Sequence, residues 1–169
     1  MLIEEDEIKR LCDQGRLFRV EPLAWRETQE RAIYVSRDIY RFLTQPSADP
    51  AANGDRRKLH RLFDRFISGQ EISAAFKRNI KGSNIKRLSP PNAEVWEFKV
   101  KARPQLRVFG RFAAKDLFLA ITGPVDRANC DFQAEKIRCQ YEWSKLLPEH
   151  SPIHGSTIDD YISAKGISL

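Results

Sequence analysis

The sequence has few cysteines and no long apolar run. Its three cysteines, Cys12, Cys130 and Cys139, are an odd number and widely spaced, with no Cys-x-x-Cys pair. This argues against a disulfide framework and against a structural zinc site. No run of about 18 apolar residues is present, so we expect no membrane span. Residues 1–10 carry four acidic side chains and no apolar core, unlike a secretory signal. These absences together predict a cytoplasmic protein.

Motifs for common cofactors and nucleophiles are also missing. The chain has no P-loop, no dinucleotide-binding glycine pattern, no serine-hydrolase elbow and no zinc-protease helix motif. His150 and His154 are four residues apart, but Pro152 lies between them, so they do not form a metal pair on one helix. We therefore expect neither a cofactor nor a metal.

The sequence does contain enough hydrophobic residues to form a core, and its positive charge is unevenly distributed. Its 169 residues are 41% hydrophobic and 10% aromatic, which suits a single domain over residues 1–169. The formal net charge is +6, and residues 81–130 alone carry ten basic and four acidic side chains. The middle of the chain thus holds as much net charge as the whole. Such a segment either binds a polyanion such as nucleic acid or forms a solvated basic surface.

Residues 1–80 have a mostly helical pattern. Apolar side chains at helical spacing predict helices over residues 2–14, 25–43, 56–67 and 74–80. Residues 17–20 are a short extended candidate. Residues 45–55 contain two prolines, a glycine and small polar side chains, which predicts a loop.

Residues 86–127 change to a period of two, which predicts an antiparallel meander of three strands over residues 95–101, 106–112 and 117–122. Placing Val100 opposite Val108 aligns the apolar side chains of the first two strands. The same register puts Glu97 opposite Arg111 on the other face, where the cationic side chains gather around Phe109.

In the second hairpin, Phe112 opposite Leu117 keeps Leu119 and Ile121 on the apolar face. Residues 131–147 predict a final helix capped by Asp131, and residues 157–163 are expected as a short strand or a docked tail. The predicted fold class is therefore α+β. N-terminal helices pack on the apolar face of the antiparallel meander, and a C-terminal helix lies beside it.

Five stretches of the meander region stand in a characteristic order. They are Lys86-Arg87-Leu88, VWEFKVK (95–101), LRVFGRF (106–112), KDLFLAITG (115–123) and VDR (125–127). In this order they resemble the RelE/ParE toxin superfamily, and within it the HigB-like and phage-derived branch. The resemblance covers about a quarter of the chain. It implies a RelE-like fold and the toxin component of a type II toxin–antitoxin pair.

Many members of that family cut mRNA at the ribosome, so the resemblance implies an mRNA endoribonuclease. The 2′-OH of RNA attacks the adjacent phosphate, and fixed guanidinium and ammonium groups stabilise the negative charge that develops. The residues that match catalytic positions are Arg107, Arg127, Lys101, Lys99 and Glu97. Glu97 is either a base or an ion-pair partner of Arg111. The residues expected to contact nucleic acid are Arg111, Phe109, Lys86, Arg87 and Arg103.

The general acid is left unassigned, because Tyr161, His150 and His154 lie far from Arg127 in the sequence. Two alternatives stay open. One is a non-catalytic nucleic-acid-binding or regulatory protein whose cations serve only as a phosphate platform. The other is a gyrase-directed toxin that binds protein through its C-terminal helix. The expected partners are mRNA, the ribosome and a cognate antitoxin that covers the cationic face.

Overall fold

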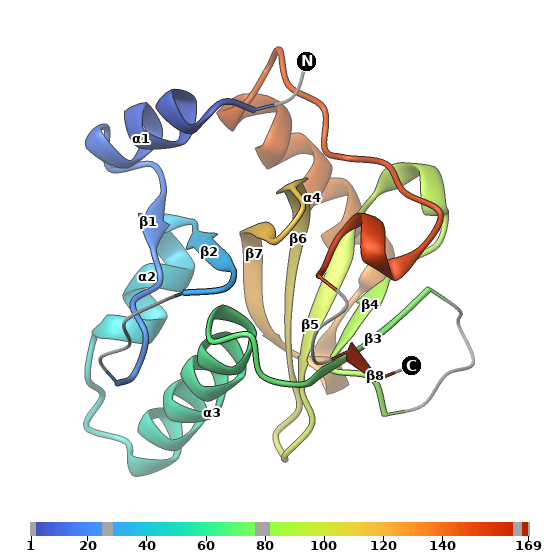
Figure 1. Ribbon diagram of the computed structural model, residues 1–169. Helices are drawn as coiled ribbons and strands as arrows, with labels where there is room; N and C mark the ends of the chain where they lie inside the picture. The colour runs from blue at the N-terminus through green and yellow to red at the C-terminus, as the bar shows by residue number, and fades with distance from the viewer. Residues whose placement is uncertain (1–2, 25–28, 77–81, 164–166, 169) are drawn as a thin grey trace.

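A mixed β-sheet forms the middle layer of the fold (Figure 1). The structure is a computed structural model that describes residues 3–24, 29–76, 82–163 and 167–168. In these residues the sheet has eight strands in the order β1-β2-β7-β6-β5-β4-β3-β8. The strands are β1 (Phe18–Arg19), β2 (Ala32–Val35), β3 (Ile72–Ala75), β4 (Ile85–Arg87), β5 (Trp96–Val100), β6 (Leu106–Ala114), β7 (Leu117–Asp126) and β8 (Ile167–Ser168).

Helices cover both faces of this sheet. They are α1 (Glu5–Asp13), α2 (Arg37–Thr44), α3 (Pro50–Ile67) and α4 (Phe132–Leu146), with short 3-10 turns η1 (Pro91–Ala93), η2 (Arg127–Asn129) and η3 (Ile158–Asp160). On one face, α2, α3 and the segment around η3 bury the apolar side chains of the central strands. On the other face, α1 and α4 form a second, smaller core with β6 and β7.

The larger core is centred on aromatic side chains that alternate along β5. Trp96 and Phe98 are fully buried, and the ring of Phe98 packs against Phe63, Phe66 and Phe118 at centroid distances of 4.5–5.7 Å. Because side chains alternate across a strand, the residues between them point to the opposite face. This alternation places Glu97 and Lys99 of β5 on the side that α4 only partly covers.

The α+β class is confirmed, and the three strands β5, β6 and β7 pair antiparallel in chain order. The predicted architecture was incomplete, however, because these strands belong to a larger mixed sheet with helices on both faces. Strand β2 pairs parallel with β7, and β3 pairs parallel with β4. The first eighty residues supply three of the strands as well as three helices.

The predicted register of the meander was wrong in both hairpins. Val100 pairs with Leu106 and not with Val108, because only residues 101–105 form the first connection. In the second hairpin Phe112 pairs with Phe118, next to a bulge. That bulge moves Leu119 and Ile121 into the core under α4, on the opposite face from the one predicted.

Three predicted elements were wrong within residues 25–80. Residues 32–35 form β2 and not part of a helix, and residues 72–75 form β3 where a helix was expected to begin. The expected loop 45–55 ends early, because Asp49 caps α3 with a hydrogen bond from the Ala51 amide and Pro50 occupies the first helical turn. The remaining parts of the predictions at 25–28 and 77–80 lie outside the described residues.

The predictions near both ends of the chain are confirmed in outline. Helix α1 lies within the predicted range 2–14, and α4 lies within 131–147 with Asp131 accepting a hydrogen bond from the Ala134 amide. The expected docked tail is present, since Tyr161 and Ile162 are fully buried after η3.

We predict that Phe98→Ala lowers the free energy of unfolding by about 3–5 kcal/mol, because it leaves a cavity between three aromatic rings. Urea unfolding followed by circular dichroism measures this change. Ile137→Ala is the control, since Ile137 is 57% exposed on α4 and its loss is expected to change stability by less than about 0.5 kcal/mol. Equal losses in both variants would contradict the placement of Phe98.

Candidate functional site

A hollow of about 920 Å³ opens between strands β4–β6 and the N-terminal half of α4. It exists because α4 packs on β6 and β7 through Cys139, Trp143 and Leu146 and leaves β4 and β5 uncovered. Six of its lining residues are basic and one is acidic. They are Lys86, Arg87, Lys99, Arg107, Arg127, Lys136 and Glu97.

The floor of the hollow holds an ion pair between Glu97 of β5 and Arg107 of β6. Arg107 Nε lies 3.4 Å from Glu97 Oε2, and the two residues are only 5% and 4% exposed. The guanidinium is fixed further, since Nη1 donates to the Leu106 carbonyl and Nη2 donates to the Gln105 side chain, each at 3.0 Å. A positive charge is therefore held in one orientation beside a buried carboxylate.

The ionisation of these groups is shifted by their partial removal from water. Burial raises the pKa of Glu97 above its usual 4.5, and the charges of Arg107, Lys99, Lys86 and Arg127 oppose that rise. Burial lowers the pKa of Lys99 and of Arg107, and Glu97 opposes both changes. The pKa of Glu97 is thus raised and that of Lys99 lowered, so both move toward neutral pH. This direction favours proton transfer by each side chain.

The rim of the hollow comes from residues that follow β7. Arg127 lies exposed on η2, where its amide donates to the Gln105 carbonyl at 2.8 Å. Lys136 of α4 reaches across to the Ser89 carbonyl at 2.5 Å, which links the helix to the loop after β4. Phe132 lines the same opening, and its ring meets Phe109 edge to face at 5.9 Å. The rim thus offers cations and one partly exposed aromatic ring.

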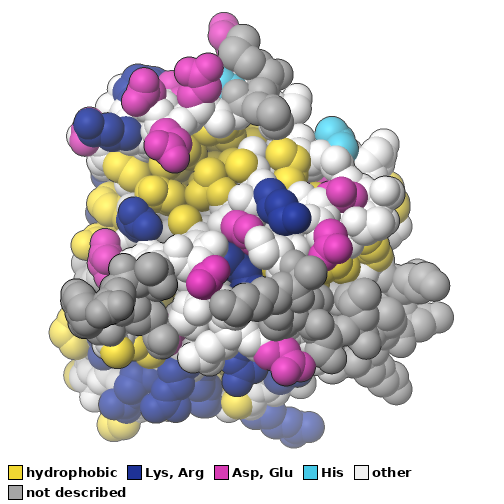
Figure 2. Space-filling view, in the orientation of Figure 1, with side chains coloured by type: hydrophobic (Ala, Val, Ile, Leu, Met, Phe, Trp, Pro, Cys, Tyr) yellow, Lys and Arg dark blue, Asp and Glu magenta, His cyan; other side chains and the backbone are white. Residues whose placement is uncertain are grey.

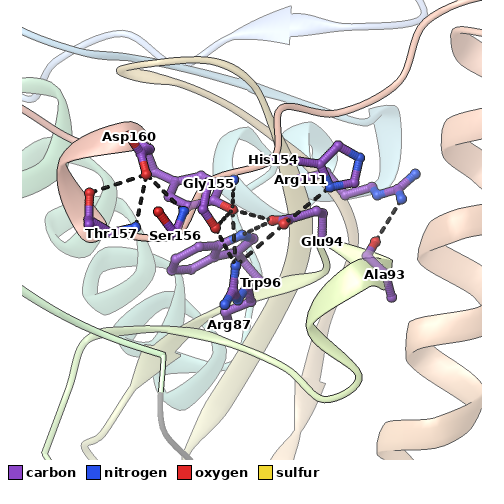
Figure 3. A network of polar contacts seen from close by, with 11 residues as sticks. Arg87, Ala93, Glu94, Trp96, Arg111, His154, Gly155, Ser156, Thr157 and Asp160 are labelled. Atoms are coloured by element: carbon purple, nitrogen blue, oxygen red, sulfur yellow. Dashed lines mark hydrogen bonds and ion pairs between the residues drawn. The ribbon is translucent and has the colours of Figure 1, made fainter.

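Arg87 connects the hollow to a buried polar network centred on Glu94 (Figure 3). Glu94 is 3% exposed, and its carboxylate accepts from the Tyr161 hydroxyl at 2.7 Å and lies 3.4 Å from Arg87 Nη1. Burial, and then the bond to Glu94, raise the pKa of Tyr161 to about 12. Arg87 also donates to the Gly155 carbonyl and stacks on the Phe76 ring at 4.1 Å. This network holds the C-terminal segment against β4 and β5.

The structure brings together most of the side chains that the sequence assigned to catalysis. Glu97, Lys99, Arg107 and Arg127 all line the hollow, as do two of the predicted nucleic-acid contacts, Lys86 and Arg87. Lys101 does not. Its side chain is exposed beyond the end of β5 and donates to the Gly82 carbonyl at 2.5 Å.

Two predicted contacts lie beneath helix α4 and not in the hollow. Phe109 is fully buried, and Arg111 is 9% exposed with its guanidinium 5.2 Å from the Trp143 ring and bonded to the Ala93 carbonyl. The predicted pairing of Glu97 with Arg111 was wrong, because Glu97 faces Phe109 and bonds to Arg107, one of the two arginines flanking Phe109.

Arg103 is also away from the hollow, exposed in the β5–β6 turn. The candidate acids fall outside the hollow as well. Tyr161 is buried in the Glu94 network, and His154, which is 62% exposed at its side chain, lies 3.4 Å from Glu94 Oε1. The backbone carbonyl of His150 accepts from the Trp143 indole.

Among the lining residues that sequence reasoning missed are two from α4, Phe132 and Lys136. Both fall on the inward stripe of the final helix, together with Cys139 and Trp143. A lysine on the buried stripe of a helix needs an anion, a carbonyl or solvent near it. The position of Lys136 on that stripe was therefore the sequence feature that could have identified it. Phe132 occupies the partly exposed aromatic position that the sequence assigned to Phe109.

Comparisons with protein-family models, with curated proteins and with solved structures gave no match to this chain. Among the described residues, no cluster of three or more His, Cys, Asp or Glu side chains is suited to hold a metal ion. None of the described helices has the length and apolar character needed to cross a bilayer.

We predict that the pKa of Glu97 lies above 4.5 and rises further in Arg107→Gln, because that variant removes the nearest positive charge. A carbon-13 NMR titration of the side-chain carboxyl measures both values. Lys101→Gln is the matched control, since Lys101 lies outside the hollow and its loss is expected to change the Glu97 pKa little. A pKa that falls in Arg107→Gln would contradict the geometry of the pair.

A second prediction concerns the Glu94 network. Tyr161→Phe removes the hydroxyl that donates to Glu94 at 2.7 Å, and we expect a loss of about 1–3 kcal/mol in the free energy of unfolding. Chemical denaturation measures the loss. Tyr141→Phe serves as the control, because Tyr141 is 60% exposed. If the two variants are equally stable, the Tyr161–Glu94 bond is not a stabilising contact.

Proposed function

We propose that this protein is an endoribonuclease whose active site is the hollow between β4–β6 and α4. The observation that carries the proposal is the Glu97–Arg107 pair, a buried carboxylate and a fixed guanidinium 3.4 Å apart in a cavity whose other charged lining residues are all cations. A phosphodiester brings the negative charge that such a cavity attracts. RNA also supplies the nucleophile, its own 2′-OH, which makes a metal unnecessary for this reaction.

In the proposed reaction Glu97 is the general base. Its carboxylate takes the proton of the 2′-OH, and the freed oxygen attacks the adjacent phosphorus. The bond from phosphorus to the 5′-oxygen then breaks, which leaves a 2′,3′-cyclic phosphate and a 5′-hydroxyl end. Arg107 and Arg127 stabilise the extra negative charge on the phosphate in the transition state. The raised pKa of Glu97 makes it a stronger base than an ordinary carboxylate.

Lys99 is the general acid in this scheme. Its ammonium group donates a proton to the departing 5′-oxygen, and the lowered pKa of Lys99 makes that transfer easier than from a solvated lysine. Lys99 Nζ is held by the Ser83 hydroxyl at 2.9 Å, so its position is defined. This assignment fills the role for which Tyr161, His150 and His154 lie in the wrong places.

The biological role we propose is the toxin of a type II toxin–antitoxin pair acting on mRNA at the ribosome. The support is the resemblance of residues 86–127 to RelE/ParE toxins together with the grouping of Glu97, Lys99, Arg107 and Arg127 in one cavity. A cognate antitoxin would then neutralise the hollow with acidic side chains, since that blocks the substrate charge directly.

The experiment is to incubate the purified protein with single-stranded RNA and to map the ends of the products. We expect 2′,3′-cyclic phosphate ends and a rate that rises with pH through the Glu97 pKa, because only the deprotonated carboxylate acts as base. Removing one charge-stabilising donor typically costs a factor of roughly 10²–10³ in rate, so Arg107→Ala and Arg127→Ala should lose activity to that extent. Arg103→Ala is the control that keeps it.

Induced expression in growing cells then tests the role. Growth arrest with cleaved transcripts that is lost in Arg107→Ala supports the toxin. If normal growth accompanies salt-sensitive RNA binding without cleavage, the protein is the non-catalytic phosphate platform instead. Arrest with DNA damage and intact mRNA points to the gyrase-directed toxin, whose docking element would be the outer side of α4, where Ile137 and Tyr141 are exposed.

A further inference from the structure

A second basic groove runs between α3 and the end of β5, outside the hollow. It has a volume of about 220 Å³, and five of its nine lining residues are cationic while none is acidic. The cations are Lys58, Arg61, Arg65, Lys99 and Lys101. The other lining residues, Leu62, Asn84, Val100 and Ala102, offer no large exposed apolar surface. The chemistry of this groove fits a polyanion and not an apolar protein segment.

The basic side of α3 is regular in its spacing. Lys58, Arg61 and Arg65 recur at three- and four-residue intervals and therefore share one side of the helix over about 10 Å. Among the described residues, no carboxylate lies within ion-pairing distance of Arg61 or Arg65, and both are exposed. Figure 2 shows Lys and Arg side chains gathered along the lower edge of the molecule, where Figure 1 places α3.

Lys99 of β5 connects this groove to the hollow. Lys99 lines both cavities, and its ammonium is bonded to Ser83. Lys101 is held by the Gly82 carbonyl. Lys58 is held by the Arg103 carbonyl at 3.2 Å and by the Asp55 carboxylate at 3.3 Å, so among the described residues the unpaired cations of the groove are chiefly Arg61 and Arg65. Fixed positive groups thus continue from the catalytic pair, around the end of β5, to the exposed arginines of α3.

We infer that this groove, defined by Lys58, Arg61, Arg65 and Lys101, binds the phosphate backbone of the same single RNA strand that is cut in the hollow. The inference rests on the proposed function and adds a substrate subsite to it. Exposed lysine and arginine groups that follow a backbone give affinity without reading sequence. The groove therefore sets how long a substrate must be, while the hollow sets where the bond breaks.

The test compares RNA of two lengths in an Arg61→Glu/Arg65→Glu double variant. A roughly 12-nucleotide RNA carrying 2′-O-methyl groups, which blocks cleavage, is used for binding, with a dinucleotide as the short ligand. We expect the variant to bind the long RNA at least about tenfold more weakly and with a salt slope smaller by roughly 1.4, since each single-strand phosphate contact contributes about 0.7. Dinucleotide binding and cleavage should not change.

Lys9→Glu/Lys115→Glu is the matched control, with the same change of net charge. Lys9 is exposed on α1, and Lys115 is exposed in the β6–β7 turn, at the opposite end of β6 from the groove. Circular dichroism checks that both variants fold. Equal losses of long-RNA affinity in the two variants would reduce the effect to net charge and overturn the subsite.

The outcomes separate this subsite from the proposed nuclease. If the wild-type protein binds long RNA through Arg61 and Arg65 but does not cleave an unmodified strand, the nuclease proposal fails and the subsite stands. If it cleaves long and short RNA equally well and the arginine variant is unaffected, the subsite fails and the nuclease stands. An arginine variant that keeps RNA affinity but loses binding to an acidic protein would also overturn the subsite.

Discussion

The incomplete cover of the second sheet face is the constraint on which the candidate site depends. Helix α4 packs on β6 and β7 through Cys139, Trp143 and Leu146, and of its described residues only Phe132 and Lys136 line the hollow. Glu97 and Arg107 are therefore removed from most of the solvent without being sealed in a core. In a sealed core, the free energy needed to remove both charges from water often exceeds their mutual attraction. At a fully exposed site, solvent screens the pair and the two pKa values stay close to normal.

The intermediate environment explains why the charges are held as they are. Arg107 has two further acceptors, the Leu106 carbonyl and the Gln105 side chain, which offset the loss of water around its guanidinium. Glu97 Oε2 is buried and makes no hydrogen bond in the described residues, beyond its ion pair with Arg107. The charge of Arg107 is therefore what offsets the removal of this oxygen from water.

The sequence predicted those parts of the fold that follow from local patterns. The alternation of Trp96, Phe98 and Val100 was sufficient to identify β5, and Asp131 marked the start of α4. It did not reveal β2, because the four residues Ala32–Val35 lie inside a longer stretch whose apolar spacing fits a helix. Strand β2 lies between β1 and β7, and β7 is more than eighty residues away in the sequence. Tertiary contacts of that range override local preference.

The candidate site was predictable in its membership but not in its geometry. Parity alone places Glu97, Lys99 and Arg107 on one face, and this held even though the strand register was wrong by two residues. Which arginine pairs with Glu97 was not predictable, because the actual register puts Glu97 opposite Phe109, between Arg107 and Arg111, and its carboxylate pairs with Arg107. The apolar periodicity of β6 did not predict that α4 covers Phe109 and Arg111, because both faces of this strand carry apolar residues.

The two-residue turn between β6 and β7 is the meeting point of distant segments. Asp116, at φ +62°, accepts from the Ala32 amide through its carbonyl and donates its own amide to the Tyr161 carbonyl, each at 2.8 Å. Its carboxylate accepts from the Ser163 amide. Neither β2 nor the tail therefore has its docking partner until this hairpin exists. A change in the conformation of this turn is therefore transmitted to both β2 and the tail at once.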